Sequence, residues 1–140
     1  MARQQVSVRV VNYGLYNRWN RESKALPRFL KFTTEIPARH EIEFGYVLDI
    51  KGAKRKKLTF EMIHPLGIHS PDGERMPDVF TGELIIPQNE YRFFLGDTVW
   101  DPLDEKCGPW RLKTFIDGHL VADKTLMLVK DDGTFSDLIG

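Results

Sequence analysis

The sequence is poor in cysteine, in long apolar runs and in net charge. Its one cysteine, Cys107, excludes an intramolecular disulfide. No apolar run approaches the roughly 18 residues that a membrane-spanning helix needs, and residues 1–11 contain no apolar core of signal-peptide length. Twenty Lys and Arg balance twenty Asp and Glu, so the whole chain has no built-in attraction for nucleic acid or anionic lipid. We therefore expect a cytoplasmic protein with no membrane contact, and the sequence carries no strong signal for a nucleic-acid partner.

The balance of charge conceals an uneven distribution along the chain. Residues 1–70 hold 13 basic and 6 acidic side chains, which gives +7, and residues 71–140 hold 7 basic and 14 acidic ones, which gives −7. Two interpretations stay open. The opposite charges meet across neighbouring strands, or they segregate and make a dipolar molecule that can associate head to tail.

Sustained helical periodicity is also missing. Only residues 19–30 come near it, and Pro27 limits a helix there to about two turns. The sequence instead alternates between apolar and polar residues, which is the period of a strand. We expect six strands, over 5–11, 29–34, 40–51, 57–64, 80–87 and 90–96, followed by a terminal hairpin over 108–128.

The terminal hairpin has the clearest local signals. Asp117-Gly118 is a typical hairpin turn pair, because Gly takes a positive φ without steric cost. Trp110 begins the first strand and is expected to anchor the core. Leu120 is assigned to the inward face of the returning strand. Lys124 interrupts that inward series, so a bulge or twist is expected there.

These strands predict an all-β protein, an Ig-like antiparallel β-sandwich of about seven to eight strands. We expect a single domain over 1–140, with its core at about 5–129 and a polar tail at 130–140. A closed barrel is the main structural alternative. The expected core consists of Val8, Val10, Phe44, Tyr46, Leu48, Phe60, Met62, Phe93, Trp110, Leu112, Ile116 and Leu126.

Four motifs in this order carry a family resemblance. They are VNYGLYN (11–17), IPARHEIEFGYVLDIKG (36–52), IHPLG (63–67) and GPWRLKTFIDG (108–118). Together they resemble an uncharacterised bacterial family, domain-of-unknown-function family 3859, and span about residues 5 to 129. The resemblance implies an Ig-type β-sandwich and carries over no catalytic residue.

Few residues are candidates for metal binding or catalysis. His64, His69, Asp72 and Glu74 lie within eleven residues, and the first three are candidate metal ligands. Pro65, Gly67 and Pro71 exclude a helix, however, and a loop with a turn explains the segment better. Cys107 would need a nearby base to form a thiolate. His119 is separated from it by about 25 Å of extended chain. We therefore expect no enzyme, no metal and no cofactor.

The longest irregular segment is the candidate binding surface. We assign the loop to 13–31, and long loops in compact domains are often functional. If its rings are exposed, they form an anchor for a partner protein; if they are buried, they plug the open end of the sandwich. The basic segment 51–57 is instead interpreted as a solvated hairpin tip. The candidate binding residues are Tyr13, Tyr16, Arg18, Trp19, Arg21 and Phe29.

The preferred function is a non-enzymatic protein-interaction or self-association module. Its partner is another protein or another copy of the chain, and pairing of strand edges would give a homodimer. The alternative is a small-ligand or carbohydrate binder that uses Trp19 or Trp100 with polar groups from 64–75. A metal-dependent enzyme at 64–74 is the third interpretation.

Overall fold

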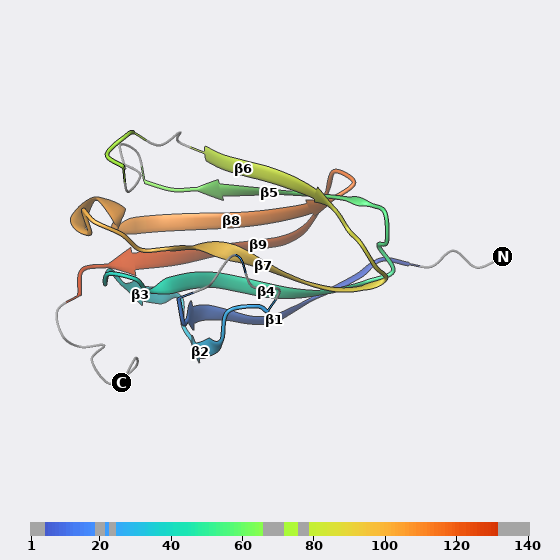
Figure 1. Ribbon diagram of the computed structural model, residues 1–140, viewed down its shortest axis with the longest axis horizontal. Helices are drawn as coiled ribbons and strands as arrows, with labels where there is room; N and C mark the ends of the chain where they lie inside the picture. Colours follow the sequence, from blue (N-terminus) through green and yellow to red (C-terminus); the bar gives the residue numbers. More distant parts are fainter. Residues whose placement is uncertain (1–4, 19–21, 23–24, 66–71, 76–78, 132–140) are drawn as a thin grey trace.

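The computed structural model of the chain describes residues 5–18, 22, 25–65, 72–75 and 79–131. In this part of the chain, nine strands form two facing sheets (Figure 1). The first sheet has the order β2-β1-β4-β7, with β1 (Ser7–Tyr16), β2 (Phe29–Phe32), β4 (Glu43–Lys51) and β7 (Glu90–Thr98). The second has the order β3-β9-β8-β5-β6, with β3 (Glu35–Pro37), β5 (Lys57–Ile63), β6 (Val79–Ile85), β8 (Gly108–Ile116) and β9 (His119–Val129). A 3-10 turn, η1 (Asp104–Lys106), precedes β8.

The core lies between the inner faces of the two sheets. Trp110 is buried as expected and packs edge-to-face on Phe44 of the opposite sheet, with 5.2 Å between the ring centroids. Tyr46 and Thr114 share a buried hydrogen bond of 2.6 Å between their hydroxyl oxygens, which also joins the two sheets. Removal of the Tyr46 ring from water raises the pKa of its hydroxyl, so the group stays a neutral hydrogen-bonding partner.

The terminal hairpin forms where the sequence predicts it. Asp117 and Gly118 have φ angles of 47° and 82°, as a turn with two left-handed residues requires. The predicted bulge, however, lies elsewhere. Thr114 pairs with Ala122 and Phe115 with Leu120, so Val121 is the extra residue in β9. This insertion turns Leu120 out to solvent and Val121 toward the core, which makes the inward assignment of Leu120 wrong.

The strand count exceeds the predicted seven or eight because the chain changes sheets in a very short step. After β2, residues 35–37 form the three-residue strand β3, which pairs in parallel with β9. Three residues are too few to show alternation. Strand β1 is also longer than expected, since it continues through a register shift between Val10 and Asn12 to Tyr16. The loop assigned to 13–31 therefore begins at Asn17.

Val10 is the clear exception to the predicted core. It pairs with the buried residue Leu48 in β4, yet it is 44% exposed. Its exposure follows from the neighbouring strand, because β2 pairs with β1 only from Gly14 onward. On the side of β1 away from β4, no described strand pairs with Val10.

The two oppositely charged halves of the sequence interleave in space. Lys57 and Glu83 form an ion pair of 2.7 Å across β5 and β6. Lys56 pairs with Asp117 at 3.4 Å, and Arg39 pairs with Asp131. Basic groups from the first half thus meet acidic groups from the second, which favours the first of the two interpretations of the charge distribution.

A second, smaller core covers the outer face of the four-stranded sheet. Tyr16, Val47 and Phe94 are buried there, and Leu26 of the 17–28 segment and Phe29 of β2 pack against them. The Tyr16 hydroxyl donates a 2.6 Å hydrogen bond to Asn12 Oδ1. The backbone N–H of Asn17 donates to the carbonyl of Arg28 at 2.9 Å and closes the neck of the segment. The second core, defined by these five apolar side chains, makes β4 a strand with both faces covered.

Candidate functional site

Four strands lie at the edges of the described sheets, and three of them carry features that discourage further pairing. Natural edge strands are kept from pairing by being short, by charged side chains and by proline. Strand β2 has four residues and includes Lys31, while β3 has three and ends at Pro37. Strand β7 is longer, but it carries Glu90, Arg92 and Asp97.

Strand β6 lacks these protections. Its seven residues, VFTGELI, include no Lys, Arg or Pro, and all seven pair with β5 without a bulge. Its one charged side chain, Glu83, is neutralised by Lys57. Val79, Phe80 and Ile85 are 41%, 42% and 60% exposed. No strand in the described part of the chain pairs with the other side of β6.

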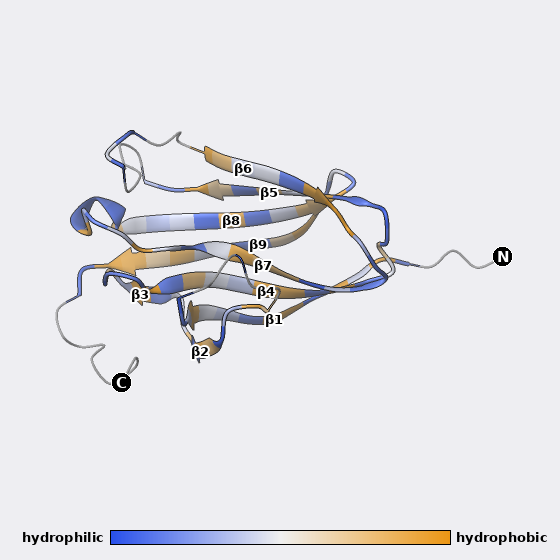
Figure 2. Ribbon diagram, in the orientation of Figure 1, coloured by the Kyte–Doolittle hydropathy of each residue, from blue (hydrophilic) through white to orange (hydrophobic). Residues whose placement is uncertain are grey.

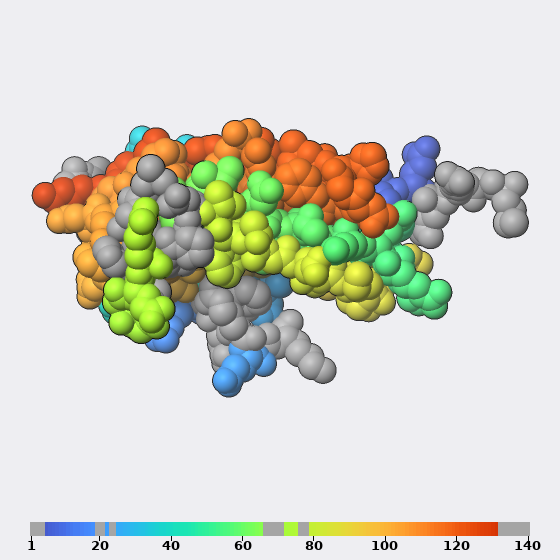
Figure 3. All heavy atoms as spheres, turned by 90° about the horizontal axis from the view of Figure 1, so that it is seen from above, coloured from blue at the N-terminus to red at the C-terminus, as the bar shows by residue number. Residues whose placement is uncertain are grey.

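Apolar residues lie at both ends of β6 and a polar residue near its centre, as the hydropathy colouring in Figure 2 shows. Seen from the β6 side, its yellow-green atoms lie on the surface of the molecule (Figure 3). Phe80 continues inward to Phe60 and Phe93, with centroid distances of 6.5 and 6.0 Å between successive rings. Gly82 leaves room for this row, because a Cβ there would lie 2.3 Å from the Phe60 ring. The free edge is therefore backed by packed aromatic side chains.

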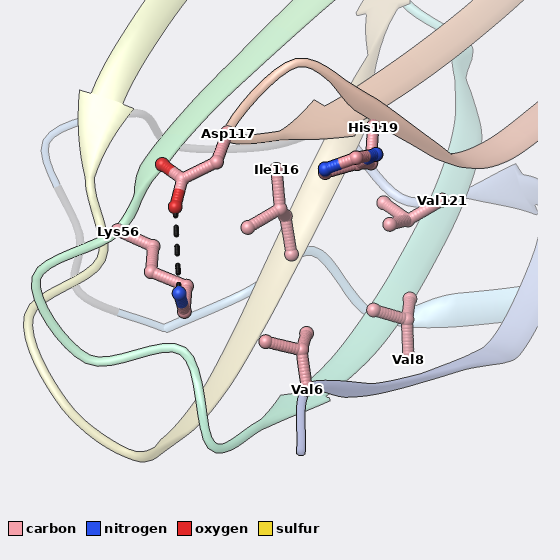
Figure 4. A pocket seen from close by; sticks show the side chains of 7 residues that line it. All are labelled: Val6, Val8, Lys56, Ile116, Asp117, His119 and Val121. Carbon is pink, nitrogen blue, oxygen red and sulfur yellow. Dashed lines mark hydrogen bonds and ion pairs between the residues drawn. The ribbon is translucent and has the colours of Figure 1, made fainter. Parts of the chain in front are cut away.

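A lateral cleft of about 420 Å³ lies on the other side of the sandwich, between β1 and the β8–β9 hairpin. Its apolar lining consists of Val6, Val8, Ile116 and Val121 (Figure 4). The cleft exists because β2 covers only the end of β1 and β3 covers only the end of β9. Over their facing parts, β1 pairs only with β4 and β9 only with β8, so one edge of each has no partner strand among the described residues.

The rim of the lateral cleft is polar. Lys56, Asp117 and His119 line it, and the Lys56 ammonium lies 3.4 Å from Asp117 Oδ2. Asp117 Oδ1 also accepts a 3.0 Å hydrogen bond from the backbone N–H of Lys57. This hydrogen bond, assisted by Lys56, holds the pKa of the Asp117 carboxyl below its usual range. The cleft therefore offers a ligand an apolar surface beside one ammonium–carboxylate ion pair.

The structure divides the six predicted binding residues. Tyr16 is 1% exposed and belongs to the second core, where Phe29 packs edge-to-face on it at 5.6 Å. Tyr13 is half-buried beneath the Lys124 ammonium, which lies 3.7 Å from the ring centroid. Arg18 is exposed and pairs with Glu41 at 3.0 Å. Trp19 and Arg21 lie outside the described residues. Tyr16 and Phe29 cover the outer face of the four-stranded sheet, whereas Tyr13 lies on its inner face and packs against the main core.

The candidate metal ligands are not brought together by what the structure describes. His64 is buried, with its ring 5.4 Å from that of Trp110 and its Nδ1 2.8 Å from the carbonyl of Pro65. Asp72 is exposed and accepts the backbone N–H of Glu74 at 3.2 Å. His69 lies outside the described residues. Over the described ranges there is no group of three or more His, Cys, Asp or Glu that could hold a metal ion.

The remaining functional candidates, Cys107 and Trp100, contact neighbouring groups of the protein. The Cys107 thiol lies 3.9 Å from the carbonyl of Leu103, and burial together with Asp104 raises its pKa. A raised pKa disfavours the thiolate that nucleophilic catalysis needs. Trp100 is half-buried, with the Lys106 ammonium 5.0 Å from its ring centroid. None of the helices in the described part of the chain has the length and apolar composition to cross a membrane.

Sequence reasoning placed no site at β6 or at the lateral cleft. A signal for β6 was present, since 79–85 contains one charge and no proline. The low number of charges and the lack of proline indicate a strand that can pair further only if the strand is known to lie at the edge of a sheet. The cleft had no local signal, because it depends on where β2 and β3 end.

Comparison with known proteins supports the fold and the family. The family model described as domain of unknown function DUF3859 matches residues 4–128. The solved structure of an immunoglobulin-like protein from Pseudomonas aeruginosa is 26% identical, with a TM-score of 0.64 over 91% of this chain and 100% of that one. No curated protein matches the chain. The chain belongs to the DUF3859 family and has an immunoglobulin-like β-sandwich fold, as the order of its motifs predicts.

Proposed function

We propose that this protein is a non-enzymatic interaction module that binds its partner by adding a strand to the free edge of β6. The observation that carries the proposal is the unprotected edge itself. A row of unpaired backbone N–H and C=O groups on β6 is a template for another strand. Val79, Phe80 and Ile85 supply exposed apolar surface beside that template.

The comparison among the four edges supports β6 over the others. Strands β2 and β3 are too short to give a partner many hydrogen bonds, and β7 presents three charged side chains. Edge strands with charges or proline resist pairing, whereas a long, apolar edge promotes it. The aromatic row behind Phe80 supports the same choice, because a packed ring loses little conformational freedom when a partner covers it.

The test compares two substitutions of the same type on two edges. In Phe80→Lys, a charge on β6 should prevent strand addition. In Phe32→Lys, the same change is made at an exposed ring on β2, which is 55% exposed and packs on Tyr13 and Phe29. Affinity capture from the cells that make the protein should recover the same partner with the unmodified protein and with Phe32→Lys, and lose it with Phe80→Lys.

Both variants must retain a cooperative thermal transition for the comparison to count. Capture that survives Phe80→Lys and is lost in Phe32→Lys would refute the β6 proposal. It would place the interaction instead on the aromatic side chains of β1 and β2, where Phe32 packs on Tyr13 and Phe29. These side chains lie in or next to the predicted binding loop at 13–31.

The lateral cleft supports a second candidate, a binder of small apolar ligands. Its apolar lining is aliphatic, with four Val and Ile side chains and no Phe, Tyr or Trp ring on which a sugar could stack. This composition favours an apolar ligand over a carbohydrate. Val6 lies at the mouth of the cleft and precedes β1, so it can be changed without disturbing a strand.

The cleft can be tested with anilinonaphthalene sulfonate, a dye that fluoresces in apolar sites. The unmodified protein should bind the dye, and Val6→Trp should abolish binding by filling the mouth of the cleft. Gln5→Trp is the matched control, since Gln5 is the exposed neighbour that does not line the cleft. Equal dye fluorescence in all three proteins would exclude the cleft as the site of binding.

A further inference from the structure

We propose that β6 pairs with β6 of a second copy of this chain, antiparallel and centred on Gly82, so that two five-stranded sheets join into one. This inference rests on the proposed use of β6 and adds the identity of the partner and the register of the pair. Its basis is the pattern of the strand, which reads the same in both directions. Two apolar residues stand at each end, a polar residue follows on each side, and Gly82 is in the middle.

A two-fold axis at Gly82 places a suitable residue of the second copy opposite every residue of β6. On the core-facing side, Phe80 lies opposite Leu84 of the second copy; on the outer side, Val79 lies opposite Ile85. The assignment of faces follows from β5, where Phe60 and Met62 pair with Gly82 and Phe80. Cross-strand apolar pairs of this kind stabilise antiparallel sheets.

The charges also suit this register. Thr81 lies opposite Glu83 of the second copy, so a hydroxyl donor faces a carboxylate acceptor on both sides of the axis. A two-fold axis at Glu83 would place the two Glu83 carboxylates directly opposite each other, which is destabilising. An axis at Thr81 would pair Phe80 with Gly82 and Val79 with Glu83, and both apolar pairs would be lost. Among these neighbouring registers, only the one centred on Gly82 pairs all seven residues.

Among the described residues, no strand occupies the edge of β6 to which a second copy would add. Strand β6 is the outermost strand of its sheet (Figures 1 and 3). The interface would be isologous, as in the commonest kind of dimer, because the same strand contributes from both sides. The row Phe80, Phe60 and Phe93 would then be covered at its exposed end.

Disulfide cross-linking tests the partner and the register together. Two single variants, Thr81→Cys and Glu83→Cys, are made in a Cys107→Ser background, and one of them carries a mass tag. Directly opposite residues have Cβ atoms about 4.5–5.5 Å apart, whereas diagonal neighbours are about 7–8 Å apart, beyond disulfide reach. The register centred on Gly82 therefore predicts a covalent heterodimer when the variants are mixed and oxidised, and no covalent dimer from either variant alone.

Each other outcome overturns the proposed pair. A covalent dimer from Thr81→Cys alone would place the axis at Thr81, and one from Glu83→Cys alone would place it at Glu83. Absence of cross-links in all three samples would exclude self-pairing through β6. Light scattering over a range of concentrations would then show either a monomer or a dimer that uses another surface. Such a failure would leave the strand-addition proposal to be decided by the Phe80→Lys and Phe32→Lys comparison.

Discussion

Replacing Trp110 with alanine is expected to lower the free energy of unfolding by about 3–5 kcal/mol, the usual cost of deleting a buried aromatic side chain. The ring is 1% exposed and bridges the two sheets through its edge-to-face contact with Phe44. Its Nε1–H also donates a 2.8 Å hydrogen bond to the carbonyl of Lys106. Small domains have only about 5–15 kcal/mol of stability in total, so this variant should approach the limit of folding. Urea denaturation measures the loss directly.

Trp110→Phe separates the two contributions of the side chain. Phenylalanine retains most of the apolar packing but leaves the Lys106 carbonyl without its indole donor. The expected cost is about 1–3 kcal/mol, the penalty for a buried polar group that loses its partner. If Trp110→Ala and Trp110→Phe were equally destabilising, the hydrogen bond to the turn η1 would be the main contribution, and the packing between sheets would matter little.

Replacing Tyr16 with alanine should cost about 3 kcal/mol, by analogy with the deletion of other buried rings, and should release the 17–28 segment from the sheet. Tyr16 packs on Phe94 at 5.0 Å and on Phe29 at 5.6 Å, so it joins the sheet to the returning chain. Limited trypsin digestion should then cut faster at Arg18 and Arg28, which are both exposed. Urea denaturation gives the accompanying change in stability.

Tyr16→Phe is the control for the segment. It preserves the ring contacts and removes only the hydrogen bond to Asn12, at a cost of about 1 kcal/mol. Trypsin cleavage at the rate of the unmodified protein is expected. If Tyr16→Ala also left the rate unchanged, the neck between Asn17 and Arg28 would be sufficient to hold the segment, and the second core would not be needed for it.

Alternation along the chain predicted most of the sandwich because the inner faces of its strands are covered by one continuous core. The inward residues of β4 and β8, among them Leu48 and Leu112, are buried as expected, and so is Met62 in β5, whereas the predicted core residue Phe60 is only partly buried. The Asp117-Gly118 turn was predictable for a local reason, since two left-handed residues suit few sequences.

What could not be predicted depends on contacts between distant parts of the chain. Val47 lies on the face of β4 opposite the predicted core residues, yet it is 4% exposed because it belongs to the second core, against which Leu26 and Phe29 pack. A signal was present in β7, where Phe93 and Phe94 point to opposite faces and both are buried. The position of β6 at an edge had no such signal, because the order of strands in a sheet is not encoded within any one strand.

The second core also affects how well the backbone amides of β4 are protected from water. Residues Glu43–Leu48 are all buried, with the main core on one face and the second core on the other. Each edge of the strand is also paired, to β1 and to β7. Water can therefore reach its backbone amides only when the whole sandwich opens, whereas the edges fray locally. The exchange rate of the β4 amides is consequently expected to give the free energy of global unfolding, whereas the amides of β6, an edge strand of the other sheet, are expected to exchange by local fraying.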